Sequence, residues 1–275
     1  MLQVKTEAFI LDKVPGYQDE GKISIFSQDF GIMRVIASGL YRPGARLAAW
    51  TEPPSWVMAD IIIPEGASHT GRLLTLSPKA VFAHLAKAYE NLSWYYFYLF
   101  LLKNFLPEGI KAPYIYNLWK ELLSSESFSD SAKRDLGFVF FTTKLLKNQG
   151  FYPSFRYCIN CERFWEDEET AYFTFSEQGL ICGKCLKENI KRFSSPNNNN
   201  SYSLEFLGLL PLKKPLEMPK GVLRISPAER KILQICEKYE QLNHVYTNIN
   251  SSHMMNDLSI KKARNFMLLF LAPLL

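Results

Sequence analysis

Short apolar runs separated by turn residues fill the first 77 residues of the chain. The runs are rich in Ile, Val, Phe and Leu, alternate in part with polar residues, and are broken by turns such as Pro15-Gly16 and Pro64-Glu65-Gly66. This pattern predicts short β-strands. About five strands in so short a segment favour a small closed or partly open barrel, and an SH3-like barrel also fits. The expected strands are Val4–Leu11, Lys22–Phe26, Gly31–Ala37, Trp56–Ile63 and Arg72–Leu76.

The pattern becomes helical after Ser77-Pro78, where a potential N-cap residue precedes a proline. Apolar residues then recur at helical spacing, which predicts a helix that ends near Phe105. The stretch Ser226-Pro227-Ala228-Glu229 is typical of a capping box and predicts a helix to about Gln241. Two further helices are expected at Pro113–Leu123 and Ser131–Asn148.

The longest apolar stretches are Leu92–Leu102 and Phe266–Leu275. Both are shorter than the roughly 20 residues that a bilayer-spanning helix needs, so we expect buried helices and no membrane partner. The N-terminal residues 1–13 lack a basic segment followed by an apolar core, and do not resemble a secretory signal. We therefore expect a cytoplasmic protein, in which paired cysteines bind metal more often than they form disulfides.

Four of the five cysteines form the pattern C-x2-C-x20-C-x2-C. Two such pairs about twenty residues apart can bring four thiolates onto one tetrahedral Zn²⁺. The sequence therefore predicts one structural zinc ion, whose binding would contribute directly to the folding of this segment. The predicted ligands are Cys158, Cys161, Cys182 and Cys185.

The residues between the two cysteine pairs are expected to form a hairpin. Phe164-Trp165 and Tyr172–Phe175 are the expected strands, and the acidic run Glu166–Glu169 is the expected tip. A thioredoxin-type redox motif uses a single CxxC at a strand–helix junction, and a catalytic zinc needs an open coordination position, so both fit less well than structural zinc. An iron–sulfur cluster is a further alternative. The fifth cysteine, Cys236, is expected to pack on the apolar side of its helix.

The positive charge of the chain is concentrated in two places. Residues 183–275 carry 14 Lys and Arg against 7 Asp and Glu, whereas residues 31–50 contain three arginines and no acid. Such local excesses suit a polyanionic partner, although a basic helix face can equally serve solubility. The residues concerned are Arg34, Arg42 and Arg46 in the first segment, and Lys184, Lys187, Lys191 and Arg192 beside the second cysteine pair.

Motifs of the common enzyme classes are absent from the sequence. There is no P-loop, no dinucleotide-binding glycine pattern, no GxSxG and no HExxH, and the four histidines are scattered. This favours a non-enzymatic binding protein. The polar run Asn197–Asn200 is expected to be a solvated connector without a recognition role.

With these elements placed, the chain resembles the bacterial recombination mediator family RecO. The first part of the resemblance is an aliphatic strand, a glycine-acid turn and a basic loop, with Gly31, Gly39 and Arg42-Pro43 at the matching positions. The second is the helix of Phe141–Leu146, which continues through Gly150-Phe151 into the first cysteine pair. The combination is more specific than either cysteine pair alone.

The resemblance implies an α+β multidomain protein: an N-terminal OB-fold β-barrel and an α-helical domain into which a four-cysteine zinc module is inserted. The corresponding ranges are 1–77 for the OB-fold, 78–150 and 193–275 for the helical domain, and 151–192 for the zinc module. It also implies binding of single- and double-stranded DNA, annealing of complementary strands, and help in loading recombinase onto DNA coated with single-strand-binding protein. The implied partners are RecR and the acidic C-terminal tail of single-strand-binding protein, in a cytoplasmic, nucleoid-associated protein.

The resemblance also suggests where DNA and partners would bind. An OB barrel binds strands through a basic groove with aromatic stacking, so phosphate contacts are expected from Lys22, Arg34, Arg42 and Arg46. Tyr41 is a candidate stacking residue, with packing against the barrel as the alternative. Family members often carry an arginine in the helix before the first cysteine pair, whereas the nearest base here is Lys144. The expected partner-binding residues are Phe138, Phe141, Lys144 and Leu145.

Two other functions are compatible with some of these features. A protein-interaction adaptor would use the zinc module and the helices only to bind partners, without intrinsic DNA binding. A zinc-dependent nuclease or deaminase is disfavoured by the closed four-cysteine set and by the missing HxE element.

Overall fold

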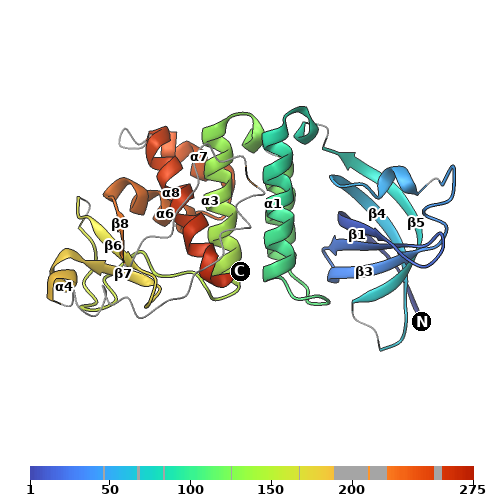
Figure 1. The fold of residues 1–275 in the computed structure, drawn as a ribbon, viewed down its shortest axis with the longest axis horizontal. Coiled ribbons are helices and arrows are strands. Elements are labelled where there is room, and N and C mark those ends of the chain that lie inside the picture. The colour runs from blue at the N-terminus through green and yellow to red at the C-terminus, as the bar shows by residue number, and fades with distance from the viewer. Residues whose placement is uncertain are drawn as a thin grey trace. The chain divides into compact units, whose positions relative to one another are not determined.

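The computed structural model describes residues 1–45, 47–66, 69–82, 84–124, 126–166, 168–188, 210, 222–250 and 256–275. The chain separates into two compact units, Met1–Ser124 and Ser125–Leu275, and Figure 1 labels most of their helices and strands. The predicted division into four segments is drawn differently, since its segment 78–150 crosses the boundary at Ser125, and it stays a prediction.

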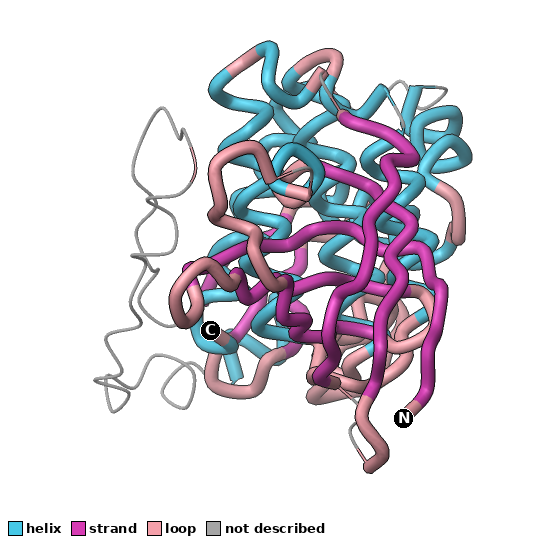
Figure 2. Tube along the Cα trace, turned by 90° about the vertical axis from the view of Figure 1, so that its right-hand side faces the viewer, coloured by secondary structure: helices cyan, strands magenta, loops and turns pink. Residues whose placement is uncertain are grey.

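The N-terminal unit begins with a closed five-stranded barrel of strand order β1-β2-β3-β5-β4. β1 pairs antiparallel with both β2 and β4, and β5 closes the ring by pairing parallel with β3 and antiparallel with β4. Figure 2 shows these strands as long magenta segments. The five predicted strands are therefore confirmed, with bounds β1 Leu2–Pro15, β2 Gly21–Ser27, β3 Gly31–Ala37, β4 Ser55–Ile63 and β5 Thr70–Val81.

The barrel interior is filled by alternate aliphatic residues, as the period-2 pattern of a strand requires. On β3, Met33, Val35 and Ala37 are buried, while Arg34 and Ile36 between them are exposed. On β4 the same alternation buries every second residue. The outward side chains of β3 can thus face solvent or a ligand.

The prediction that a helix starts at Ser77-Pro78 is wrong, because β5 continues to Val81. Pro78 lies opposite Val57 at a register shift between Trp56 and Val57. A bulge tolerates a residue without an N–H, so this proline does not end the strand. The chain becomes helical only at η2, Leu85–Lys87, followed by α1, Tyr89–Phe105.

Two helices, α1 and α2 (Pro113–Ser124), complete the N-terminal unit and pack on the barrel through aromatic rings. The ring of Phe9 on β1 lies 5.2 Å from that of Tyr116 and 6.3 Å from that of Trp119. The hydroxyl of Tyr95 donates to the Ile10 carbonyl at 3.4 Å. The apolar run within α1 is therefore buried, as predicted. Among the described residues, no helix is both long and apolar enough to cross a membrane.

The C-terminal unit is built around α3, which contacts α6, α7 and α8. α3 is buried along most of its length, from Asp135 to Leu146. The capping box of α6 is confirmed: Ser226 Oγ accepts from the Glu229 N–H at 3.3 Å, and Glu229 Oε2 accepts from the Ser226 N–H at 2.9 Å. The helices span α3 Ser131–Asn148, α6 Pro227–Lys238, α7 Leu242–Asn250 and α8 Asp257–Leu271.

A three-stranded antiparallel sheet of order β7-β6-β8 adjoins these helices (Figure 1). The predicted hairpin partner is wrong: β6 pairs with β7 and β8, while Phe164 makes only an isolated bridge to Tyr157. The chain reverses directly after β6, where Gln178 adopts a positive φ of 49°. The next residues therefore return along β6 and become its partner. The elements span β6 Ala171–Thr174, β7 Gly179–Cys182, α4 Gly183–Glu188 and β8 Val222–Ile225.

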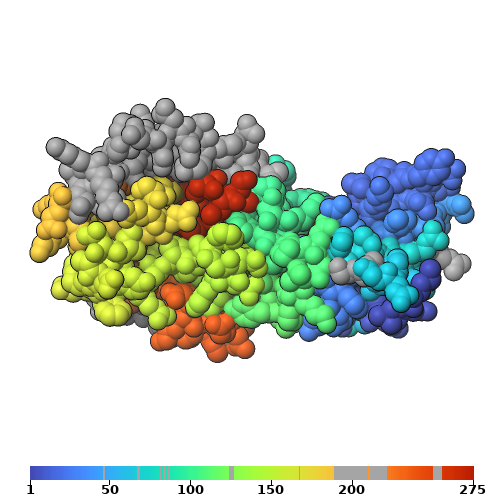
Figure 3. Space-filling model, turned by 90° about the horizontal axis from the view of Figure 1, so that it is seen from below, coloured from blue at the N-terminus to red at the C-terminus, as the bar shows by residue number. Residues whose placement is uncertain are grey.

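An aromatic cluster attaches this sheet to α8. The ring of Phe173 on β6 lies 5.1 Å from that of Phe266 and 5.6 Å from that of Phe270, and Phe155 lies 5.7 Å from Phe266. The apolar C-terminal run is thereby buried, as predicted. In Figure 3 the yellow-green part of the chain, which includes α3 and the segment after it, forms a large part of the visible face of the C-terminal unit.

Candidate metal centre and nucleic-acid interface

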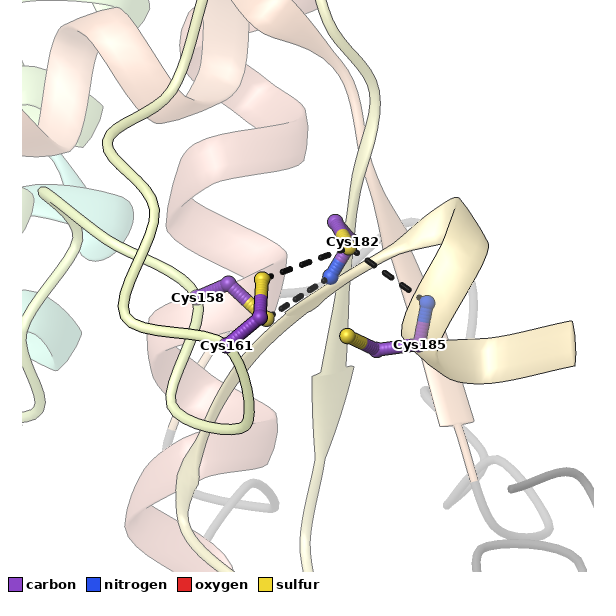
Figure 4. Close-up of side chains that lie close together, drawn as sticks. All are labelled: Cys158, Cys161, Cys182 and Cys185. Atoms are coloured by element: carbon purple, nitrogen blue, oxygen red, sulfur yellow. Dashed lines mark hydrogen bonds between the residues drawn. The ribbon is translucent and has the colours of Figure 1, made fainter. Parts of the chain in front are cut away.

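The four predicted metal ligands come together in the C-terminal unit (Figure 4). Cys158 and Cys161 lie in a turn between α3 and β6, Cys182 ends β7 and Cys185 lies in α4. Their Sγ atoms all lie within 4.8 Å of one another, and those of Cys161 and Cys182 are 4.0 Å apart. A tetrahedral zinc with Zn–S bonds of about 2.3 Å needs sulfur atoms roughly 3.8 Å apart. The cluster therefore could hold one metal ion with little rearrangement.

Tight backbone turns present the sulfur atoms to one another. In the first turn, the Glu162 N–H donates to the Cys158 carbonyl at 2.8 Å while Glu162 adopts a φ of +57°. The Cys182 N–H donates to Cys158 Sγ, and the Cys185 N–H to Cys182 Sγ, both at 3.4 Å. Because N–H donors favour the thiolate over the thiol, these turns suit cation binding.

The thiols experience opposite effects from their surroundings. Burial raises the pKa of Cys182, but hydrogen bonds from Cys185 and from the Arg163 side chain outweigh it and lower that pKa to about 7. Burial raises the pKa of Cys185 to about 12. A bound cation favours deprotonation of every ligand, so the metal would override both shifts.

The donor set leaves no coordination position open to a substrate. Cys158, Cys182 and Cys185 are buried, and Cys161 is the exposed member. Four thiolates complete a tetrahedral shell, which is typical of a structural metal rather than a catalytic one. Cys236 lies elsewhere, fully buried in α6, so its predicted packing role is confirmed.

Of the basic residues of the barrel that were predicted to contact DNA, Lys22 and Arg34 line the same hollow. Lys22 on β2 and Arg34 on β3 are both exposed. Arg42 is exposed and pairs with Asp19 at 3.0 Å. Tyr41 is 40% exposed, and Lys13 Nζ lies 5.8 Å from its ring centre. Arg46 lies outside the described residues.

A hollow of about 310 Å³ opens beside Lys22 and Arg34. Its wall contains charged residues that the sequence pattern did not single out, because they come from distant parts of the chain. Arg34 and Glu108, for example, are separated by 74 positions. The charged residues of the hollow are Lys22, Arg34, Lys103, Asp12 and Glu108.

The second basic cluster is only partly placed. Lys184 and Lys187 are exposed on α4, beside the cysteine cluster. Lys191 and Arg192 lie outside the described residues, as does the polar run Asn197–Asn200.

The four residues expected to bind a partner are buried in α3. Phe138, Phe141 and Leu145 are fully buried, and Lys144 is 2% exposed. Lys144 Nζ donates to the Glu237 carbonyl at 3.0 Å and to Glu240 Oε1 at 3.1 Å. These side chains form part of the core of the C-terminal unit, and their role in partner binding stays a prediction.

The fold and the cysteine cluster define a two-unit α+β protein with a β-barrel and a candidate metal centre. A family model described as "Recombination protein O C terminal" matches residues 86–241. A DNA repair protein RecO of Caldicellulosiruptor bescii is 27% identical over 194 residues, covering 69% of this chain and 75% of the relative. That of Caldicellulosiruptor saccharolyticus is 23% identical over 255 residues, or 91% of each chain. The chain belongs to the recombination protein O family, which confirms the resemblance found in the sequence.

Proposed function

We propose that this protein is a non-enzymatic mediator of recombinational DNA repair. It binds single- and double-stranded DNA, anneals complementary strands, and helps load recombinase onto DNA coated with single-strand-binding protein. Membership of the recombination protein O family implies the role in repair and recombination. RecR and the acidic tail of single-strand-binding protein are the proposed protein partners, in the cytoplasm and at the nucleoid.

The barrel is the proposed DNA-binding domain, as an OB-fold. The observation that carries this is its strand order, in which β3 and β5 pair parallel to close an otherwise antiparallel ring. OB-folds bind nucleic acid strands across the face that contains β2 and β3. Lys22 and Arg34 are exposed on those two strands. Arg42 and Arg46 follow in the next loop, with Tyr41 as a stacking residue.

Zinc is the proposed metal, in a structural role. Thiolates are the soft donors that Zn²⁺ accepts in closed four-cysteine sites. The metal would be held by all four cysteines and would stabilise the turns at both pairs, leaving the helical unit to present surfaces to partners. Lys184 and Lys187, with Lys191 and Arg192, are proposed to add a second phosphate-binding face.

Strand annealing of complementary oligonucleotides tests the proposal. The wild-type protein should accelerate annealing, and charge reversal of Arg34, Arg42 and Arg46 to Glu should abolish the acceleration. An adaptor without intrinsic DNA binding is the alternative, favoured by the ion pairs that Arg34 and Arg42 make with Glu108 and Asp19. If the protein is such an adaptor, the wild-type form would not anneal DNA, and the charge reversal would leave its function unchanged.

A further inference from the structure

The hollow on the barrel has an acid, Glu108, held against one of its exposed bases, Arg34. The loop after α1 lies along the start of β3: the Gly109 N–H donates to the Ile32 carbonyl at 2.9 Å, and Ile32 and Glu108 form a parallel bridge. Gly31 allows this approach, because a Cβ there would lie 1.9 Å from the Ile110 carbonyl oxygen. The position of Glu108 is therefore set by backbone contacts and not only by its own side chain.

Glu108 occupies the Nε–Nη2 edge of Arg34, one of the two edges through which a guanidinium can hold a phosphate. Its Oε1 accepts from Arg34 Nε at 2.8 Å and lies 2.5 Å from Arg34 Nη2. A guanidinium presents these donors as a fork that fits carboxylate and phosphate alike, so the two anions compete for it.

The other bases of the hollow differ in their pairing. Lys103 pairs with Asp12. Burial raises the pKa of Asp12, but its contacts with Lys103 and Ser24 outweigh burial and the net pKa lies below its ordinary value. For Lys22, the described residues contain no ion-pair partner. The hollow thus combines three cations with two carboxylates, a net charge of +1.

We propose that this hollow binds one backbone phosphate of single-stranded DNA, and that Glu108 is a built-in competitor that restrains the affinity of Arg34 for it. The inference rests on the proposed DNA-binding function. A phosphate can pair with Lys22 directly, but it must displace Glu108 to use the Nε–Nη2 edge of Arg34. Removing the charge of Glu108 therefore strengthens DNA binding instead of merely weakening the loop.

The test is fluorescence anisotropy of labelled single-stranded DNA over a salt series, using the full-length protein loaded with zinc. Glu108→Gln keeps the size of the side chain and an oxygen acceptor but removes the charge. Glu65→Gln removes one charge from an exposed turn of the same barrel and is the matched control. Arg34→Gln and the double variant Arg34→Gln/Glu108→Gln show whether any gain passes through Arg34.

One additional phosphate contact steepens the dependence of log K on log salt by about 0.7, which at ~0.1 M salt corresponds to binding about five-fold tighter. We expect this for Glu108→Gln relative to Glu65→Gln, and no gain when Arg34 is already replaced. If Glu108→Gln binds DNA no more tightly than Glu65→Gln, the inference is overturned but the proposed function is not. A gain that survives the loss of Arg34 would have the same consequence. Absence of DNA binding by the wild-type protein would overturn the proposed function together with it.

Discussion

Arg264 on α8 donates from Nη1 to both carboxylate oxygens of Asp135 on α3, at 3.0 Å each. The side chains are 13% and 5% exposed, respectively. Burial raises the pKa of Asp135, and Arg264 opposes that shift without cancelling it. The pair therefore joins two helices of the C-terminal unit at a cost in desolvation.

Removing one partner of this ion pair should lower the free energy of unfolding more than replacing both partners. Asp135→Asn leaves a buried guanidinium without its counter-ion, and we expect a loss of about 3 kcal/mol in the free energy of unfolding. The double variant Asp135→Leu/Arg264→Met should lose less, since it leaves no buried charge. Denaturant unfolding measures both, and a double variant less stable than Asp135→Asn would contradict this account.

Substitution of Gly31 should destabilise the fold more than substitution of Gly44, for a steric reason. Gly31 and Gly44 have positive φ values of 70° and 75°, but a Cβ at Gly44 meets nothing within 4 Å. Gly44→Ala should cost only the backbone strain, roughly 1–2 kcal/mol. Gly31→Ala must also move the loop at Ile110, so a distinctly larger loss is expected in thermal or denaturant unfolding. Equal losses for the two variants would show that the loop is not held against β3.

Metal content should depend on the clustered cysteines and not on Cys236. The purified protein should contain one equivalent of zinc, measured by elemental analysis. Cys182→Ser should lose the metal and destabilise the C-terminal unit, because binding contributes to folding. Cys236→Ala changes a buried cysteine outside the cluster and should keep one equivalent. Full zinc occupancy in Cys182→Ser would contradict the four-cysteine site.

Phe173 should be a main attachment of the sheet to α8. It is fully buried, and Phe173→Ala should cost about 3–5 kcal/mol through lost contacts and the cavity left behind. Phe164, in the same module, is 71% exposed, and Phe164→Ala should change stability by less than about 0.5 kcal/mol. Denaturant unfolding of both variants measures the two losses of stability. Similar losses would contradict the special role of Phe173.

Local patterns in the sequence predicted much of this fold. The bounds of β3 and of α3 agree with those expected, because a clear period and clear end signals coincide there. The four-cysteine cluster followed from spacing alone. The start of the first helix was wrong because Pro78 falls at a bulge, where its missing N–H is harmless.

Contacts between distant segments could not be predicted in the same way. The hairpin partner of β6 was misassigned, and β8 joins the same sheet from a segment about fifty residues further along the chain. Nothing near Arg34 in the sequence indicates Glu108, because the parallel bridge that brings them together belongs to the tertiary fold. Phe138 and Phe141 were expected from the family resemblance to bind a partner, and the sequence alone did not indicate that both are fully buried in the C-terminal unit.

The central claim is that this protein binds DNA through the basic face of its barrel. Its most direct test is the affinity of the zinc-loaded, full-length protein for labelled single-stranded DNA, measured by anisotropy across a salt series with the metal content checked. We predict binding whose affinity falls steeply as salt rises, since phosphate contacts release counterions. Binding that is absent or insensitive to salt, with zinc present and the fold intact, would contradict the claim and favour a partner-binding adaptor.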